Sequence, residues 1–303
     1  MNHPLVSVVV PTHNRAAFIG VAIRSVLAQT DKNLEIIVVD DASTDETPVI
    51  LRQLANIDSR IKILRNTKSL GGGGARNVGI HASSGEWIAF LDDDDEWDKT
   101  KIKYQLEKMR AHPSAVACTC SYKLQLGLRS AKVVRIKNEI SLDQLLRRNY
   151  LGGASMCLCS RNVLLRIGGF DTGFRSGQDW DLWVRLLEEG EIVNCEDVLV
   201  NYGIHNGARI SNNLDSQYFG ARRFYFKYRS LMNDSIRKLR VSNCCFIMSQ
   251  QKKRGINSRL KYLRLAFCNS SFRVRLSYAK NSLPILIKDF IGEFRAASNE
   301  GAK

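Results

Sequence analysis

The stretch Gly85–Asp95, with the sequence GEWIAFLDDDD, decides the fold. A short apolar run between a glycine and a block of acids predicts a buried strand. Because four like charges cannot be buried without partners, we expect Asp92–Asp95 at the carboxyl end of this strand, where open α/β sheets bind their ligands. Carboxylate oxygens bind hard divalent cations, and such a cation suits a substrate that carries phosphate. A bare acidic run is more often a surface loop that caps the following helix, so the neighbouring sequence decides between the two interpretations.

Strands and helices are predicted to alternate along the first third of the chain. Apolar runs predict strands buried on both faces at residues 5–10, 34–39, 61–64 and 86–91, and helical spacing predicts helices at 16–29, from about 43 to 55, and from about 75. Ser43 or Thr44 is the expected N-cap of the second helix, and Gly71–Gly74 is expected to form a flexible turn before the third. This alternation predicts an α/β fold whose mostly parallel sheet is flanked by helices.

Further elements are predicted in the rest of the chain. The pattern indicates helices at 99–110, 141–148 and 180–189 and strands at 115–122, 154–159 and 198–204. After about residue 215 the sequence is helical, basic and aromatic. We therefore expect an α/β domain over residues 1–214 and a basic helical extension over residues 215–303.

Length and composition restrict the class of protein. A chain of 303 residues with 44% hydrophobic residues suits one large domain with or without an appendage. The N-terminus predicts no signal peptide, and no apolar run reaches the ~18 residues that span a bilayer, so we expect a cytosolic protein. Its eight cysteines include the pairs Cys118/Cys120 and Cys157/Cys159. A zinc site is one interpretation of these pairs, and buried reduced thiols are the favoured one.

The net charge of +15 is concentrated in the last third of the chain. Residues 215–303 hold 19 Lys and Arg against 5 Asp and Glu, whereas residues 1–214 hold 26 against 25. This asymmetry predicts an anionic partner for the tail, either a membrane surface or a nucleic acid. Aromatic and basic residues alternate in Phe224–Arg229 (FYFKYR), which suits a helix on an anionic lipid surface. A basic cap that packs on the α/β domain is an equal alternative, and nucleic-acid binding is less favoured.

Five motifs lie at predicted strand ends or helix starts. They are VVVPTHNR at residues 8–15, VVDDASTDET at 38–47, GGGARNVG at 72–79, FLDDDDEW at 90–97 and GQDWDLWVRL at 177–186. In this order and spacing they resemble the successive motifs of the family 2 inverting glycosyltransferases, over about residues 5–205. The resemblance implies a GT-A fold, with a nucleotide-binding half to about residue 112 and an acceptor half over about 113–214. It also implies transfer of a hexosyl group from a nucleotide-sugar donor.

The resemblance assigns donor-binding residues as well. It implies that the nucleotide is lined by Pro11, Thr12 and Asn14. Asp40 resembles the acid that hydrogen-bonds the uracil ring, although an aspartate at a strand end also stabilises turns. Gly73 lies in a glycine run that permits backbone close to a ligand. Arg76 resembles the family arginine that faces the nucleotide, with a surface ion pair as its alternative.

The acids after the fourth strand resemble the D-x-D motif of the family. The resemblance implies that Asp92 faces ribose or metal and that Asp94 is a direct ligand of Mn²⁺ or Mg²⁺ on the diphosphate. Asp93 is assigned to the donor-binding side, or it points with Asp95 to solvent or caps the next helix. His205 occupies a position where some relatives place a histidine near the diphosphate or metal, and a structural role is its alternative.

Asp179 is the candidate general base. An inverting transfer needs one carboxylate that takes the proton of the acceptor hydroxyl. An acid at this position also stabilises a helix N-terminus through its dipole, and we assign that role to Asp181. Trp180 or Trp183 can stack on a sugar, although Trp183 at helical spacing is expected in the core. Gln178 replaces a glutamate that is common in the family.

The sequence therefore predicts a metal-dependent inverting glycosyltransferase. Its expected donor is a UDP-sugar, and its expected acceptor is a glycan or lipid-linked oligosaccharide in cell-surface polysaccharide synthesis. We expect the protein in the cytoplasm, peripherally bound at the inner face of the membrane. A polyprenyl-phosphate sugar synthase and a nucleotide-sugar-binding protein without turnover are the alternatives.

Overall fold

The computed structural model describes residues 5–126, 130–136, 139–204, 213–251 and 253–270, together with residues 274, 278 and 279. Contacts between residues divide the chain into two compact units. Unit 1 consists of Met1–Gly173 and Gln178–Gly207, and unit 2 of Phe174–Gly177 and Ala208–Lys303. A short segment of unit 2 is therefore inserted into the sequence of unit 1.

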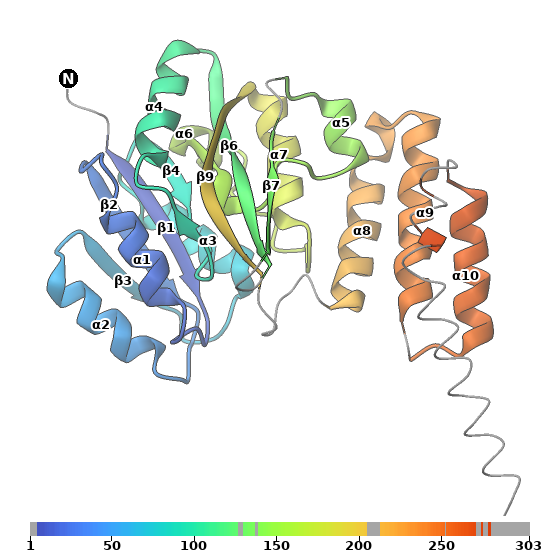
Figure 1. Ribbon diagram of the computed structural model, residues 1–303, viewed down its shortest axis with the longest axis horizontal. Helices are drawn as coiled ribbons and strands as arrows, with labels where there is room; N and C mark the ends of the chain where they lie inside the picture. Colours follow the sequence, from blue (N-terminus) through green and yellow to red (C-terminus); the bar gives the residue numbers. More distant parts are fainter. Residues whose placement is uncertain are drawn as a thin grey trace, which may run out of the picture. The chain divides into compact units, whose positions relative to one another are not determined.

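The first half of unit 1 alternates strands and helices, as predicted. It consists of β1 (Val6–Thr12), α1 (Ile19–Leu27), β2 (Leu34–Asp40), α2 (Thr47–Ile57), β3 (Ile61–Arg65), α3 (Gly71–Ala82) and β4 (Trp87–Phe90). β1 pairs in parallel with β2 and β4, and β2 pairs in parallel with β3, which gives the order β3-β2-β1-β4 (Figure 1). Every residue of β1 and β2 is buried, as expected for strands covered on both faces.

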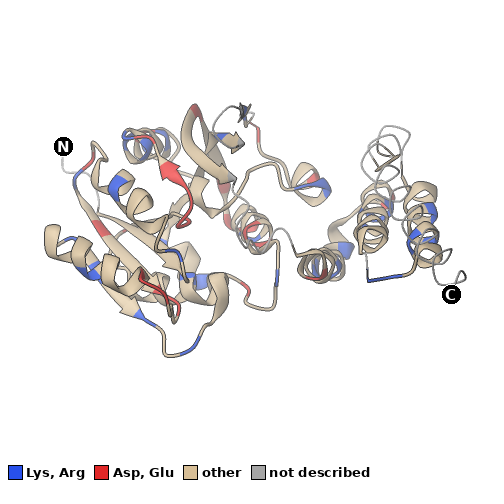
Figure 2. Ribbon diagram, turned by 60° about the horizontal axis from the view of Figure 1, so that its bottom comes forward, with Lys and Arg blue, Asp and Glu red and all other residues tan. Residues whose placement is uncertain are grey.

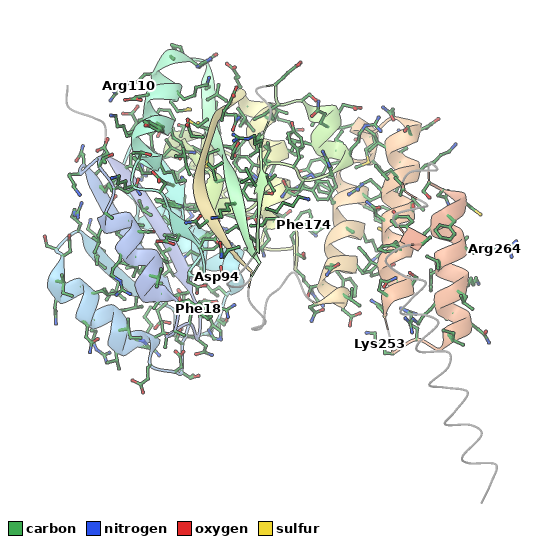
Figure 3. The ribbon with its side chains drawn as sticks, in the orientation of Figure 1. Phe18, Asp94, Arg110, Phe174, Lys253 and Arg264 are labelled. Carbon is green, nitrogen blue, oxygen red and sulfur yellow. The ribbon has the colours of Figure 1, made fainter. Side chains whose placement is uncertain are left out.

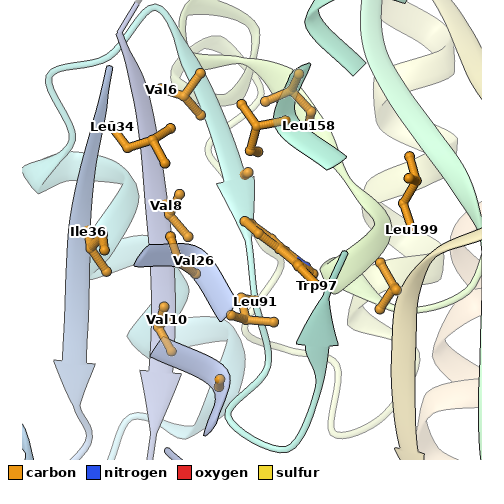
Figure 4. Close-up of a cluster of buried hydrophobic side chains, with 14 of the residues drawn as sticks. Val6, Val8, Val10, Val26, Leu34, Ile36, Leu91, Trp97, Leu158 and Leu199 are labelled. Carbon is orange, nitrogen blue, oxygen red and sulfur yellow. The ribbon is translucent and has the colours of Figure 1, made fainter. Parts of the chain in front are cut away.

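Both faces of these strands are packed. Val6, Val8 and Val10 of β1 pack with side chains of α1 and α2 in one core cluster, part of which is shown in Figure 4. Ile37 and Val39 of β2 pack with α3 in a second cluster. Both faces are covered because successive side chains of a strand point to opposite faces of the sheet. Because parallel strands end at the same edge of a sheet, the loops that follow β1, β2 and β4 come together there.

The second half of unit 1 completes a mixed sheet. It consists of β5 (Glu96–Trp97), α4 (Lys101–Ala111), β6 (Ala115–Leu126), β7 (Ser130–Val134), α5 (Leu142–Arg147), the 3-10 turn η1 (Ala154–Met156), β8 (Leu158–Ser160), α6 (Arg161–Arg166), α7 (Gln178–Glu189) and β9 (Glu191–Ile204). The sheet continues from β4 in the order β8-β6-β9-β5, with β7 on β6. β6 and β9 are parallel, whereas β5, β7 and β8 run antiparallel to their neighbours. The parallel arrangement therefore holds for the first four strands, and the predicted strand at 154–159 is instead η1 followed by the short β8.

The glycine run is helical, which differs from the prediction. Gly71–Gly74 forms the first turn of α3 rather than a flexible turn. The backbone N–H groups of Leu70 and Gly71 donate to the carboxylate of Asp41 at 2.8 and 2.9 Å. A negative charge at this end stabilises the helix, so Asp41 fixes the start of α3.

The start of α2 also differs from the prediction. The helix begins at Thr47, with Glu46 in the N-cap position and no side-chain cap. The hydroxyl of Ser43, one of the two predicted caps, accepts a hydrogen bond from the Asn14 N–H (2.9 Å). Ser43 therefore joins the loops after β1 and β2 instead of capping the helix.

The cysteines of the two C-x-C pairs lie in the core. Cys118, Cys120, Cys157 and Cys159 are all buried and form no disulfide bond. Burial raises the pKa of Cys120 to about 12, so this thiol stays protonated, whereas a metal ligand is a thiolate. These environments favour reduced core thiols over a zinc site.

The C-terminal part of unit 2 is mainly helical in the residues that the structure describes. It contains α8 (Leu214–Tyr228), the 3-10 turn η3 (Arg229–Leu231), α9 (Asp234–Gln250) and α10 (Ile256–Cys268). α9 packs against both α8 and α10, and Figure 2 shows Lys and Arg along these helices. Asn213 and Asn233 cap α8 and α9. Over the described ranges, no helix combines the length and the apolar character needed to cross a membrane.

Glu35 in β2 connects several segments of unit 1. Its buried carboxylate accepts hydrogen bonds from Lys62 Nζ (2.8 Å), Ser7 Oγ (2.5 Å) and Ser84 Oγ (2.7 Å). Burial alone would raise the pKa of Glu35, but these hydrogen bonds lower it from 4.5 to about 2. The ionised carboxylate therefore stabilises the fold above pH 4.5, and this contribution is lost as the pH falls toward 2.

We expect Glu35→Gln to lower the free energy of unfolding at pH 7 by about 1–3 kcal/mol, because the amide cannot satisfy the same donors. The difference from wild type should shrink at pH 3, and chemical denaturation at both pH values measures it. Glu107→Gln, at an exposed position of α4, is the control and should change little at either pH. An equal loss of stability at pH 7 and pH 3 would contradict the linkage.

Candidate active site

The acidic loop Asp92–Asp95 joins β4 to β5 at the edge where β1 and β2 also end. Asp92 forms an ion pair with Arg76 of α3, and the guanidinium carbon of Arg76 lies 5.2 Å from the ring centroid of Phe170. Arg76 is only 8% exposed, so it does not make the surface ion pair that was its alternative. Burial would lower the pKa of Arg76, but the charges of Asp92 and Asp179 raise it. This buried cation therefore links the acidic loop to the candidate base.

Asp95 and Asp93 do not point to solvent, contrary to one expectation from the sequence. Asp95 is 2% exposed, and its carboxylate accepts hydrogen bonds from Ser155 Oγ and from the Gly203 N–H (3.0 Å). Asp93 Oδ1 lies 3.6 Å from Arg15 Nε. Burial raises the pKa of Asp93 to about 7 and the pKa of Asp95 well above its usual value. The sequence did not predict this burial, because the groups that bind the two carboxylates, Ser155, Gly203 and Arg15, lie in distant segments of the chain.

Asp94 lies beside the end of β9 (Figure 3). A Cβ atom at Gly203 of β9 would come within 2.1 Å of the Asp94 carbonyl oxygen, so a glycine is required for this approach. The acidic loop and the end of β9 are therefore held together by close packing. His205 lies outside the described residues, so its part in metal binding stays a prediction.

Asp179 lies in the first turn of α7. Its Oδ1 is buried without a hydrogen-bond partner in the described part of the chain. Burial raises the pKa of Asp179 to about 6, with an opposing effect from the charge of Arg76 and a further increase from that of Asp92. A carboxylate with this pKa is ionised at neutral pH and is a stronger base than an ordinary aspartate, which suits general base catalysis.

Asp181 has a different environment from Asp179. It is fully buried, and its carboxylate pairs with Arg185 Nε at 2.8 Å one turn later in α7. These contacts support the structural role assigned to it. Trp183 is 1% exposed and belongs to the core, as predicted, and Trp180 donates its indole N–H to the carbonyl oxygen of Leu145 (2.6 Å).

Gly153 lies next to the carboxylates of both Asp92 and Asp179. A Cβ atom on this glycine would lie 3.9 Å from Asp92 Oδ2, 3.8 Å from Asp179 Oδ2 and 3.5 Å from Tyr202 Cε2. The two carboxylates therefore face the same small space. Gly153, Ser155 and Tyr202 belong to none of the five motifs, and the pair of glycines before η1 is the only hint of this turn in the sequence.

Two predicted donor-binding residues fix the loops after β1 and β2. Asp40 accepts a hydrogen bond from the Ser43 N–H (2.9 Å) and lies 3.1 Å from Arg65 Nη1. The side-chain oxygen of Asn14, whose φ is 54°, accepts a hydrogen bond from the Thr44 N–H (2.7 Å). Both side chains therefore shape the edge of the sheet where the nucleotide is predicted to bind.

Gly73 allows α3 and α7 to meet. A Cβ atom at Gly73 would lie 3.2 Å from Gln178 Nε2, which is tighter than ordinary contact. The close approach that this glycine permits is therefore to a side chain of α7, next to the candidate base. Pro11 and Thr12, the last residues of β1, are buried at the C-terminal edge of the sheet.

Comparison with known proteins identifies relatives that cover most of the chain. Residues 7–174 match the sequence profile described as Glycosyl transferase family 2. A Bacillus subtilis (strain 168) protein, provisionally named as the teichuronic acid biosynthesis glycosyltransferase TuaG, is 31% identical over 260 residues, which cover 85% of this chain and 98% of that protein. The Escherichia coli UDP-Glc:alpha-D-GlcNAc-diphosphoundecaprenol beta-1,3-glucosyltransferase WfaP is 33% identical over 211 residues, which cover 69% and 80% of the two chains.

Solved structures share the fold. S. aureus TarS 1–349 in complex with UDP-GlcNAc gives a TM-score of 0.67 at 19% identity and covers 97% of this chain and 92% of its own. The mannosyltransferase PcManGT from Pyrobaculum calidifontis, in complex with GDP-Man and Mn²⁺, gives a TM-score of 0.60 at 19% identity, with coverage of 94% and 81%. This likeness confirms the predicted GT-A fold class. The profile match and the relatives together show that the chain belongs to glycosyl transferase family 2 and is a glycosyltransferase.

Proposed function

We propose that this enzyme transfers a sugar from a UDP-sugar to a lipid-linked oligosaccharide in cell-surface polysaccharide synthesis, with inversion at the anomeric carbon. The observation that carries the proposal is the buried carboxylate of Asp179, which lies near Asp92 and whose Oδ1 has no hydrogen-bond partner in the described part of the chain. WfaP is named for UDP-Glc and a diphosphoundecaprenol-linked acceptor. A Campylobacter jejuni relative, 32% identical over 249 residues, is named as a GalNAc(5)-diNAcBac-PP-undecaprenol beta-1,3-glucosyltransferase. These names support the two substrate classes.

In the proposed reaction, the acceptor hydroxyl oxygen attacks the anomeric carbon of the donor sugar. The bond from that carbon to the diphosphate oxygen breaks, and its electron pair leaves with UDP. Asp179 accepts the hydroxyl proton. This role fits its pKa of about 6 and its Oδ1, which has no hydrogen-bond partner in the described part of the chain. Arg76 helps to keep Asp179 ionised before the transfer, because its charge lowers the pKa of that carboxyl.

Asp92 and Asp94 are the proposed ligands of Mn²⁺ or Mg²⁺, with His205 as a further ligand. The acidic loop fits such an ion because burial and neighbouring acids raise the pKa of Asp93 and Asp95, and a cation relieves that repulsion. Among the described residues no three His, Cys, Asp or Glu side chains are arranged around one point. Diphosphate oxygens and water would therefore complete the coordination. When bound, the ion neutralises charge on the leaving diphosphate.

We expect Asp179→Asn to leave UDP affinity nearly unchanged and to lower the transfer rate by about 10²–10⁴-fold, the range typical of a lost general base. The amide keeps the size of the side chain but cannot take the proton. Calorimetry with UDP measures the first effect. Transfer of radiolabelled glucose from UDP-glucose to a bacterial lipid extract measures the second.

Asp181→Asn is the matched control in the same turn of α7. It removes the charge partner of Arg185, whose side chain is 14% exposed, so the free energy of unfolding should fall by about 3 kcal/mol. The folded variant should transfer sugar at nearly the wild-type rate. An inactive Asp181→Asn enzyme beside an active Asp179→Asn enzyme would overturn the assignment of the base.

Asp94→Ala should abolish the part of the UDP affinity that depends on Mn²⁺, because it removes the proposed direct ligand. Calorimetry with UDP, in the presence of Mn²⁺ and then of a chelator, measures this part. Glu96→Ala, at an exposed position of β5, is the control and should keep the Mn²⁺ dependence. A folded Asp94→Ala variant with the same Mn²⁺-dependent affinity as wild type would rule out this ligand.

α8 carries an exposed face of aromatic and basic side chains. Phe219 and Phe226 are 44% and 51% exposed, and Arg222 lies between them at helical spacing. The guanidinium carbons of Arg222 and Arg229 lie 5.3 and 5.5 Å from the ring centroid of Phe226. Helix faces of this composition bind anionic lipid surfaces. This face is therefore proposed to hold the enzyme on the cytoplasmic side of the membrane, near a lipid-linked acceptor.

The double variant Phe219→Ser/Phe226→Ser should lose most of its binding to vesicles that contain phosphatidylglycerol, because it removes the apolar part of this face. Arg222→Gln/Arg229→Gln should weaken binding by about 1 kcal/mol per charge. Vesicle flotation measures both effects, with Ile57→Ser on α2, where the native side chain is 76% exposed, as the control. Equal binding of wild type to anionic and neutral vesicles, or no binding, would contradict the proposal.

A further inference from the structure

Gly153 lies where neither its backbone nor its packing requires a glycine. Its φ of −82° and ψ of −177° are extended values that any residue adopts. The nearest atoms to a Cβ at this position would lie at 3.5 to 3.9 Å, which is ordinary van der Waals contact. The preceding Gly152 is different, because its φ is +85° and a Cβ there would lie 3.0 Å from Tyr122 Cε1. Neither backbone strain nor a close contact therefore explains the glycine at 153.

Hydrogen bonds fix the backbone on both sides of Gly153. The carbonyl oxygen of Gly152 accepts from Asn149 Nδ2 (2.9 Å) and from Trp183 Nε1 (3.2 Å). The Met156 N–H donates to the carbonyl oxygen of Gly153 (3.3 Å). A side chain added at 153 would therefore stay close to its present neighbours instead of moving away from them.

The missing side chain leaves a space between two carboxylates. Asp92 Oδ2 and Asp179 Oδ2 both lie within 4 Å of the Cβ position of Gly153, and the ring of Tyr202 borders it as well. The other oxygen of Asp92 is paired with Arg76. A side chain at position 153 would therefore lie next to both the acidic loop and the candidate base.

We infer that Gly153 is a specificity-determining residue, whose missing side chain keeps this space open for the ring of a sugar acceptor. The inference rests on the proposed transfer reaction. It identifies Gly153 as the residue that determines how large an acceptor can be in that reaction. Water or a small alcohol reaches Asp179 without filling the space, whereas a sugar ring fills it. The chemistry is the same in each case: the O–H proton moves to Asp179, a bond forms to the anomeric carbon, and the bond from that carbon to UDP breaks.

Gly153→Ala and Gly153→Val fill the space in two steps, and initial rates with UDP-glucose would be measured for water, methanol and octyl N-acetylglucosaminide. Rates with water and methanol should change by less than about twofold. For the sugar acceptor, kcat/KM should fall by about tenfold or more with alanine, the scale on which one added methylene group discriminates, and further with valine. UDP affinity, measured by calorimetry, should be unchanged. Gly255→Ala is the control, because the Gly255 φ is −56° and no described atom lies within 4 Å of its Cβ position.

An equal fall in rate for all three nucleophiles, a loss of UDP affinity, or unchanged sugar transfer by Gly153→Val would overturn the role of Gly153. The proposed function itself would fail if the wild-type enzyme released no UDP from UDP-glucose, UDP-galactose or their N-acetyl forms with any of the three nucleophiles.

Discussion

The buried carboxylate of Asp95 ties together three segments of the candidate active site. It accepts hydrogen bonds from the Ser155 hydroxyl and from the Gly203 N–H, and Ser155 Oγ in turn accepts one from the Asp92 N–H (3.0 Å). The acidic loop, the turn η1 and the end of β9 are therefore fixed relative to one another. An unpaired charge at this depth would be strongly destabilising, so the loop cannot move without losing these partners. The positions of Asp92 and Asp94 depend on this arrangement.

The buried cation of Arg76 determines how charge is distributed among the acids. It forms an ion pair with Asp92, and its charge opposes the rise that burial causes in the pKa of Asp179. Burial raises the pKa of Asp93 and of Asp95, and the charge of Arg76 is not among the main effects that oppose this rise. Burial therefore raises the pKa of Asp93, Asp95 and Asp179 alike, and of these three Asp179 has the charge of Arg76 among the main causes that oppose the rise.

The sequence predicted those parts of the fold and site that depend on local patterns. Continuous apolar runs predicted the positions of β1 to β4 along the chain, and motifs at strand ends and helix starts led to Arg76, Asp92 and Asp179, which the fold brings together. The helical start of α3 was not predicted, because it depends on a carboxylate 30 residues away, that of Asp41. Gly153 was also missed, since its contribution is an absent side chain and leaves no periodic signal.

The division of the chain into units has a consequence for truncated gene products. Phe174–Gly177 directly precedes α7 yet belongs to unit 2. Phe174, labelled in Figure 3, is 1% exposed. The cations of Arg223 and Lys227 of α8 lie 5.2 and 5.5 Å from its ring centroid. A premature stop codon before α8 would uncover this ring four residues before Gln178, where the helix that carries Asp179 begins. A nonsense mutation before α8 would therefore remove the packing partners of Phe174, in the segment that leads into α7, while every acidic residue of the candidate site remains encoded.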